Sequence, residues 1–110
     1  MKQKDIYWAD LNPVKGAEQT GKRPIVIISG NTMNDNLGIF IICPITTKIK
    51  NYAGCVVLKK DKTNKLKQDS EIITFQIRTI AKERLDKKIG EITKEQLSKI
   101  FEGLDLVLNN

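Results

Sequence analysis

The chain has 110 residues, 40% of them hydrophobic and 29% charged, which is typical of a single globular domain (residues 1–110) and excludes a disordered or fibrous protein. It contains no histidine and only two cysteines, so histidine-based catalysis, Cys₂His₂ and Cys₄ zinc sites and a scaffold of several disulfides are excluded. The net charge of +6 is spread over the chain and suits a polyanionic partner such as nucleic acid, although lysine-rich solubility explains it equally well.

Three stretches in the first half of the chain have the pattern of strands: residues 5–11, 24–29 and 38–46. The last two are nearly continuous apolar runs, as expected of buried strands. Pro44 lies within the third run and has no N–H to donate, so we expect it at a sheet edge or a bulge. The glycine- and asparagine-rich residues between these strands, 14–22 and 30–36, predict loops.

The second half predicts shorter elements: a strand at 55–58, a basic turn at 59–65, a strand at 70–77, one helical turn at 82–85 and a final strand at 87–92. Side chains alternate between the two faces of a strand, so Gln76 and Arg78 are expected on one face and Ile77 in the core. The lysine-rich residues 59–67 form either a solvated turn or a patch that attracts a polyanion.

The C-terminal segment has the pattern of an amphipathic helix of about four turns. Thr93 and Gln96 are spaced as a capping box, with Thr93 as the N-cap. The apolar residues that follow at helical spacing are Leu97, Ile100, Phe101, Leu104, Val107 and Leu108. We therefore expect a mainly β protein with a C-terminal helix: a small, strongly bent sheet or barrel whose open side the helix covers. Part of the apolar helix face is expected to remain for a second subunit.

The polar loop at residues 16–24 is the most informative stretch for function. It places a carboxylate, an amide, a hydroxyl and two cations close together between glycines, a composition that brings polar groups to a ligand. Arg23 follows Gly21-Lys22, so the phosphate-binding P-loop pattern is not satisfied. A solvated hairpin loop remains the alternative for this segment.

Two further polar stretches follow apolar strands. Residues 44–48 bring two threonines and a lysine to a strand end, where they can contact a phosphate or have a purely structural role. Residues 76–79 either take part in binding or form an ordinary polar face. Tyr7 and Trp8 are expected to pack in the opening strand, with stacking on a base as the alternative.

Taken together, these blocks resemble the MazF/PemK family of toxin–antitoxin endoribonucleases, in order and spacing, over nearly the whole chain. The matching blocks are DIYWADLNP at 5–13, GAEQ at 16–19, GKRPIVII at 21–28, PITT at 44–47, DS at 69–70, QIRTI at 76–80, RL at 84–85 and IG at 89–90. The resemblance implies a compact Src-homology-3-like barrel with a C-terminal helix. It also implies a symmetric homodimer whose groove binds single-stranded RNA, and inhibition by a cognate acidic antitoxin.

The resemblance implies metal-independent cleavage with no cofactor, and it assigns roles to individual residues. Arg23 aligns with the catalytic arginine of the family, Thr46 with its catalytic threonine, and Glu18 and Gln19 fall in its signature loop. The residues expected to bind RNA are Gln19, Lys22, Thr47, Lys48, Gln76 and Arg78. We expect the protein in the cytoplasm with no membrane partner, because no apolar run approaches the roughly 18 residues that span a bilayer and no signal peptide is present.

The resemblance implies attack by the RNA 2′-OH, with a 2′,3′-cyclic phosphate and a 5′-OH as products. The absence of histidine means that positioning and electrostatics must supply much of the rate. The planar Arg23 guanidinium suits the phosphoryl charge and the Thr46 hydroxyl can donate to the same oxygens. Glu18 is the candidate general base. Many relatives carry an acidic residue where this chain has Phe75, so no carboxylate can act at that position.

Two other functions remain as alternatives. One is a non-catalytic nucleic-acid-binding barrel, which Phe75 makes plausible and the presence of both Arg23 and Thr46 opposes. The other is a gyrase poison on the related CcdB-like fold. That activity depends on a tryptophan close to the C-terminus, whereas the single tryptophan here is Trp8.

Overall fold

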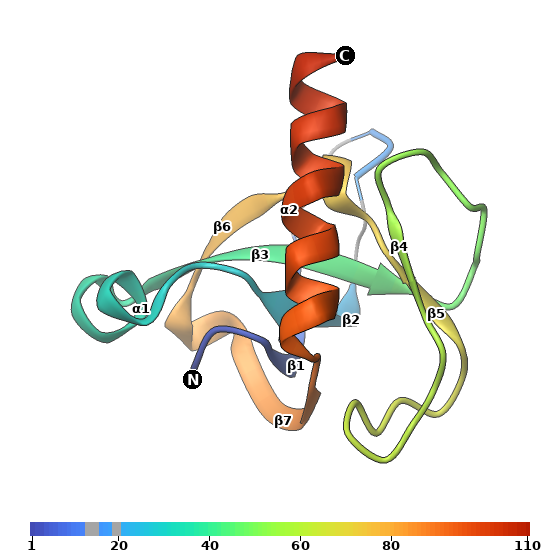
Figure 1. Ribbon diagram of the computed structural model, residues 1–110. Coiled ribbons are helices and arrows are strands. Elements are labelled where there is room, and N and C mark those ends of the chain that lie inside the picture. Colours follow the sequence, from blue (N-terminus) through green and yellow to red (C-terminus); the bar gives the residue numbers. More distant parts are fainter. Residues whose placement is uncertain (13–15, 19–20) are drawn as a thin grey trace.

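The computed structural model describes residues 1–12, 16–18 and 21–110 (Figure 1). Its strands are β1 (Asp5–Asp10), β2 (Lys22–Ile27), β3 (Ile39–Thr46), β4 (Val56–Leu58), β5 (Ser70–Ile72), β6 (Arg78–Ala81) and β7 (Leu85–Glu91). Its helices are α1 (Asn31–Leu37) and α2 (Lys94–Asn109), with 3₁₀ turns η1 (Thr74–Gln76) and η2 (Lys82–Arg84). The strands pair in the order β4-β5-β3-β2-β1-β7, and β6 pairs with β3. The predicted fold class, mainly β with a C-terminal helix, is confirmed.

The short connection at η2 explains why the sheet bends. β6 pairs with β3 and β7 pairs with β1, so these two strands lie at opposite edges of the β6-β3-β2-β1-β7 sheet. In a flat sheet the two edges would be about 19 Å apart, whereas the stretch from Ala81 to Leu85 spans at most about 14 Å. The sheet must therefore curl, although it is not closed by a β6–β7 ladder among the described residues.

Side chains alternate between the two faces of each strand, and apolar side chains cover both faces of the central strands, so both faces are buried. Inside the curl lies an apolar cluster that includes Tyr7, Ile25, Ile27, Phe40 and Ile42. The opposite face carries a second cluster, which α2 covers with Leu97, Ile100 and Leu104. Cys43 belongs to this second cluster, and burial, helped by Cys55, raises the pKa of its thiol to about 12. The expectation that Cys43 behaves as a small hydrophobic side chain is confirmed.

Helix α2 stands across the sheet and projects beyond it at its C-terminal end (Figure 1). Thr93 and Gln96 form the predicted capping box, each side chain accepting the other residue's backbone N–H. Phe101 and Leu108 remain 45% and 75% exposed, so only part of the apolar face enters the core. Gly103 lies directly on Gly54, since a Cβ at Gly103 would be 1.9 Å from the Gly54 carbonyl oxygen. Among the described residues, no helix is long and apolar enough to cross a membrane.

The prediction of a loop at residues 30–36 is wrong, because α1 occupies most of this segment. Gly30 caps the helix N-terminus in an extended conformation, and Gly38 ends it with a φ of +66°. Asn34 is buried and its side-chain amide donates to the Ser29 carbonyl at 2.8 Å. The local asparagine-rich sequence favours a loop, and this buried hydrogen bond to Ser29 together with the two caps makes it a helix.

The continuous strand predicted at 70–77 is also wrong, and Pro44 supplies the physical reason. β3 pairs with β6 as far as Ile42, which lies opposite Arg78, and it pairs with β5 from Ile45, which lies opposite Ile72. Between these two pairs β3 has two residues and the chain from β5 to β6 has five, so that chain carries three extra residues. Pro44 lies between these two ladders and has no N–H to continue either, so the partner chain turns through η1. Pro44 therefore lies at a bulge and not at a sheet edge; the bulge is one of the two positions that the sequence predicts for it.

Candidate active site

The sheet register brings the two predicted catalytic residues together. β2 and β3 pair from Ile27 opposite Ile42 to Ile25 opposite Pro44. Arg23 and Thr46 each lie two residues beyond this last pair, at neighbouring ends of the two strands. Arg23 is half-buried, whereas Thr46 is buried at 6% exposed.

Arg23 and Thr46 line one hollow of about 290 Å³, which is called the Arg23 hollow below. Its other lining residues are Ala17, Lys48, Lys50, Tyr52, Ile73, Phe75 and Gln76. Three cationic side chains therefore meet here, and none of the described lining residues is acidic. Such a hollow is suited to a phosphate or another anion.

The Thr46 hydroxyl is oriented by the chain that follows it. Its Oγ1 accepts the backbone N–H of Lys48 at 3.1 Å. A hydroxyl has one proton to donate in addition to its lone pairs, so the Thr46 O–H remains able to donate to an oxygen in the Arg23 hollow.

Glu18 lies beside the Arg23 hollow, in a smaller neighbouring hollow of about 170 Å³. Gln76 and Arg78 both line this smaller hollow, together with Ile77, but Gln76 lies in η1, so the strand alternation from which these two side chains were expected on one face does not apply here. Gln76 Nε2 donates to the Ala17 carbonyl at 3.3 Å, and Arg78 Nη1 donates to the Leu11 carbonyl at 3.4 Å. The expectation that Ile77 enters the core is wrong: it is 38% exposed, because η1 replaces the strand before it.

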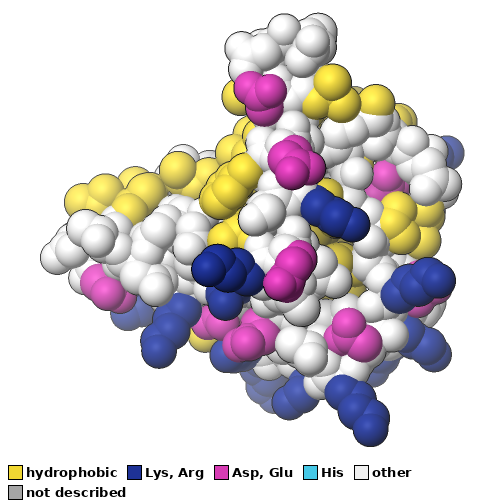
Figure 2. Space-filling view, in the orientation of Figure 1, with side chains coloured by type: hydrophobic (Ala, Val, Ile, Leu, Met, Phe, Trp, Pro, Cys, Tyr) yellow, Lys and Arg dark blue, Asp and Glu magenta, His cyan; other side chains and the backbone are white. Residues whose placement is uncertain are grey.

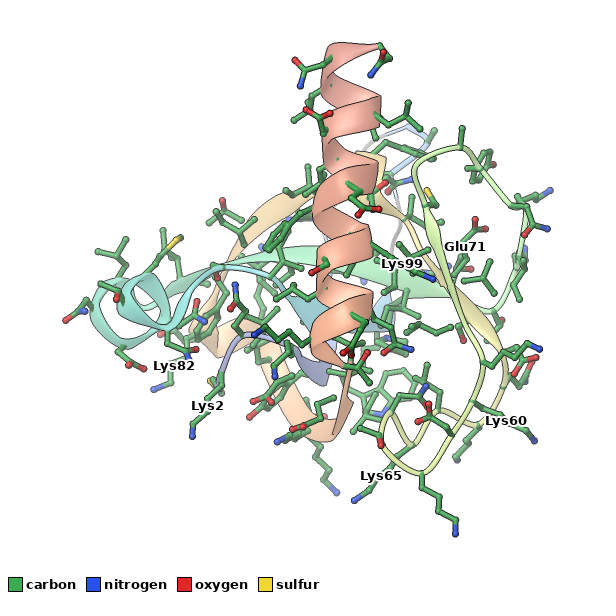
Figure 3. The ribbon with its side chains drawn as sticks, viewed as in Figure 1. Lys2, Lys60, Lys65, Glu71, Lys82 and Lys99 are labelled. Atoms are coloured by element: carbon green, nitrogen blue, oxygen red, sulfur yellow. The ribbon has the colours of Figure 1, made fainter. Side chains whose placement is uncertain are left out.

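Lys22 and Thr47 line a third hollow, of about 340 Å³, centred on Trp8. Trp8 is 42% exposed, so the expectation that it packs in the interior is wrong, whereas Tyr7 is buried as expected. Arg23 also lines this Trp8 hollow, together with Lys65 and Lys67 of the basic turn. Figure 3 shows Lys60 and Lys65 projecting outward from that turn.

The solvent face of α2 and the two hollows differ in the charge of their side chains. Figure 2 shows acidic side chains spaced along the solvent face of α2, where Glu95, Glu102 and Asp105 are exposed. The residues around the Arg23 and Trp8 hollows are instead predominantly basic. Within the described ranges, no group of three or more acidic or cysteine side chains is placed to hold a metal ion.

Sequence reasoning missed two residues of the Arg23 hollow, Lys50 and Tyr52, because they follow the matching blocks in a segment without a recognisable motif. The Tyr52 ring packs edge-on to Phe75 with ring centroids 5.2 Å apart, and both rings are about half exposed. Gln19, predicted to bind RNA, lies outside the described residues.

A family model described as PemK-like, MazF-like toxin of type II toxin-antitoxin system matches residues 2–108. The endoribonuclease MazF of Staphylococcus saprophyticus is 36% identical over 109 residues, covering 98% of this chain and 91% of that protein. MazF from Deinococcus radiodurans superposes with a TM-score of 0.85 at 22% identity, over 100% and 97% of the two chains. An endoribonuclease from a mycobacterial species, solved with its cognate antitoxin, superposes with a TM-score of 0.80 at 21% identity. The superposition covers 98% of this chain and 94% of that chain.

Proposed function

The chain belongs to the PemK-like, MazF-like family of toxins of type II toxin–antitoxin systems, and from this membership we propose that it is a sequence-selective endoribonuclease. It cleaves single-stranded RNA without a metal ion or other cofactor. One observation carries the proposal: Arg23 and Thr46, far apart in the chain, line one hollow with two further cations and no described acidic residue. A histidine-free site of this kind is suited to cleavage by charge stabilisation.

In the proposed reaction the RNA supplies its own nucleophile. The 2′-oxygen forms a bond to the scissile phosphorus while the bond from phosphorus to the 5′-oxygen breaks. The 2′-OH loses a proton and the leaving 5′-oxygen gains one, which yields a 2′,3′-cyclic phosphate and a 5′-OH. The protein must hold the 2′-oxygen in line and stabilise the negative charge of the phosphorane.

Arg23 and Thr46 act on that charge. The Arg23 guanidinium can donate two parallel hydrogen bonds to phosphoryl oxygens, and its charge is permanent at neutral pH. The Thr46 hydroxyl donates a further hydrogen bond to the same group, since its oxygen is already engaged by Lys48 N–H. Lys48 and Lys50 line the same hollow and add positive charge around the phosphate.

Glu18 remains the proposed general base. Its hollow shares Phe75 and Gln76 with the Arg23 hollow, which supports a carboxylate acting from the adjacent position. The remaining proposed RNA contacts surround this centre: Gln19, Lys22, Thr47, Lys48, Gln76 and Arg78.

Phe75 is the observation that favours the non-catalytic alternative, because relatives often carry an acidic residue there. It removes one candidate carboxylate and leaves Arg23, Thr46 and Glu18 in place. A protein that binds RNA through this surface and leaves it intact would establish the alternative.

We further propose that the protein is a homodimer in the cytoplasm and that a cognate antitoxin inhibits it. The mycobacterial endoribonuclease solved with its antitoxin supports this partner. A disordered, acidic antitoxin segment complements the +6 charge of the chain and folds on binding.

The first test is cleavage of a long single-stranded transcript of mixed sequence in the presence of a metal chelator. We expect cleavage at a short recurring sequence with 5′-OH products. Activity that disappears with the chelator and returns with magnesium would exclude the metal-free reaction.

The second test compares Arg23→Ala with Lys22→Ala. Removing the guanidinium should lower the single-turnover cleavage rate at least about 100-fold, the scale of losing one preorganised donor to a developing charge. Affinity for an RNA with a 2′-deoxy nucleotide at the mapped cleavage position should fall much less. Lys22→Ala, next in the chain and in the Trp8 hollow, should weaken affinity modestly and reduce its salt dependence. Equal losses of activity in both variants, in step with affinity, would mean that Arg23 only attracts RNA.

A further inference from the structure

Glu71 is a fully buried carboxylate that none of the proposed steps uses. It lies in β5 directly opposite Thr46, in the ladder where Ile72 pairs with Ile45. Residues opposite each other share a face of the sheet, so Glu71 lies directly beside the proposed catalytic threonine. Burying an ionisable side chain is costly unless its polar atoms are satisfied.

Three consecutive backbone amides satisfy this carboxylate. Glu71 Oε1 accepts the N–H groups of Lys50 at 2.8 Å and Asn51 at 3.2 Å, and Oε2 accepts that of Tyr52 at 3.0 Å. Asn51 has a φ of +55°, the left-handed conformation that turns successive N–H groups toward one point. Such a turn is an anion-binding nest, and here its anion is a side chain of the same protein. Figure 3 shows Glu71 inside the curve of the segment that follows β3.

The segment held by Glu71 supplies much of the Arg23 hollow. Residues 47–53 follow Thr46 without regular secondary structure, and they carry Lys48, Lys50 and Tyr52 into that hollow. All the side chains of residues 47–52 are exposed. The three hydrogen bonds to Glu71 are therefore the main buried polar contacts described for this segment.

We propose that Glu71 is a positioning residue for RNA cleavage, which anchors residues 50–52 so that Lys48, Lys50 and Tyr52 face the phosphate held at Arg23 and Thr46. The proposal rests on the endoribonuclease function proposed above. Glu71 does not touch RNA, because both of its oxygens are buried against the protein's own amides. It acts through the segment that it holds, by fixing cations before the substrate arrives.

The experiment compares Glu71→Ala and Glu71→Gln with Asn34→Ala as the control. Asn34 is also a buried polar side chain that accepts and donates hydrogen bonds, so its loss also destabilises the protein. Its partner Ser29 accepts the N–H of Ile41, which is about 17 Å from Thr46 along β3. Single-turnover cleavage of the long transcript and residue-resolved amide hydrogen exchange are measured for each variant, well below its unfolding temperature.

We expect Glu71→Ala to lower the cleavage rate at saturating RNA at least about 10-fold, and Asn34→Ala to change it less than twofold. Glutamine keeps one acceptor oxygen but presents an NH₂ group to the Tyr52 N–H. Glu71→Gln should therefore lower the rate about threefold, and its Tyr52 amide should lose protection while the amides of Lys50 and Asn51 keep theirs. This pattern does not depend on whether Glu71→Ala folds.

Two results would overturn the proposal: wild-type cleavage rates in both Glu71 variants, or a loss of amide protection spread evenly over the protein. If the wild-type protein fails to cleave RNA, the proposed function fails, and the exchange pattern at residues 50–52 still decides whether Glu71 holds the segment. If the wild-type protein cleaves and the Glu71 variants cleave equally well, only the positioning role fails.

Discussion

Phe75 shows how one substitution changes the chemistry that a residue position can supply. An acidic side chain there would put a negative charge into both the Arg23 hollow and the hollow of Glu18. Phe75 instead presents an aromatic ring, 45% exposed and packed edge-on against Tyr52. Exposed aromatic rings beside cations are the groups on which the bases of single-stranded nucleic acids stack.

We therefore predict that Phe75→Ala lowers RNA affinity roughly fivefold to 100-fold, the range expected for losing one stacked base at about 1–3 kcal/mol. The cleavage rate at saturating RNA should change less. Fluorescence anisotropy with the 2′-deoxy RNA measures the affinity, and Leu37→Ala is the control, because Leu37 is 60% exposed at the end of α1.

Phe75→Asp separates stacking from acid–base chemistry. A carboxylate here repels phosphate, so affinity should fall further than in Phe75→Ala. A Phe75→Asp variant that cleaves faster than the wild type would show that an acid at this position contributes to catalysis, and wild-type affinity in Phe75→Ala would show that the aromatic ring is not a binding group.

At the scale of elements, α2 and the segment before β4 are fitted to each other through two glycines. Gly103 lies against Gly54, which has a φ of +85° and whose carbonyl accepts the Thr74 hydroxyl at 2.7 Å. Thr74 begins η1, the turn that carries Phe75 and Gln76. The helix, η1 and the Arg23 hollow are thus connected through one tight backbone contact.

Gly103→Ala should destabilise the protein even though alanine favours helices. The gain in helix propensity is about 0.5–1 kcal/mol, whereas forcing a methyl group into a filled space costs about 1–3 kcal/mol. The new Cβ would meet the Gly54 carbonyl oxygen at 1.9 Å, so the steric cost should prevail and the Tm should fall by several degrees. Thermal unfolding measures this. Ser98→Ala, on the exposed face of α2, should be neutral or slightly stabilising, and a Gly103→Ala variant as stable as Ser98→Ala would refute the contact.

The sequence predicts elements well where local and tertiary preferences agree. Helix α2 follows from its apolar spacing and the Thr93 cap, and β3 from its apolar run. It fails where a contact outside the element decides: α1 depends on Asn34 bonding to Ser29, five residues earlier, and η1 depends on Pro44 in another strand. The composition of neither segment shows that this contact forms.

The residues of the candidate site also fall into those that the sequence predicts and those that only the folded structure shows. Arg23 and Thr46 were found through recognisable blocks, whereas Lys50 and Tyr52 lie in a segment whose conformation depends on Glu71, twenty or so residues away in the chain. A buried glutamate and an exposed one look alike in sequence, because burial is a property of the folded neighbourhood.

At the scale of the whole molecule, apolar side chains remain uncovered on α2. Phe101, Leu106 and Leu108 are all more than 40% exposed on a helix that projects beyond the sheet (Figure 1). Singly exposed apolar residues are ordinary, but several along one projecting helix are typical of a surface that another chain covers.

We predict a homodimer at micromolar concentration, with α2 contributing to the interface. Sedimentation equilibrium should give twice the chain mass of 12.5 kDa, and Phe101→Asp should shift the protein toward the monomer. A single 12.5 kDa species across this concentration range would contradict the dimer. A dimer unaffected by Phe101→Asp would place the interface elsewhere.

Arg23 and Thr46 each lie two residues beyond the pair formed by Ile25 and Pro44, so their approach depends on the register of that ladder, and this limits how the gene can change length. A codon inserted within β2 after Arg23, or within β3 before Thr46, moves one partner by a residue and turns it to the opposite face. A codon inserted between the two strands, from Gly30 to Gly38, leaves this arrangement unchanged. Diverged relatives should therefore differ in length around α1 and keep two fixed spacings, from Arg23 to Ile27 and from Ile42 to Thr46.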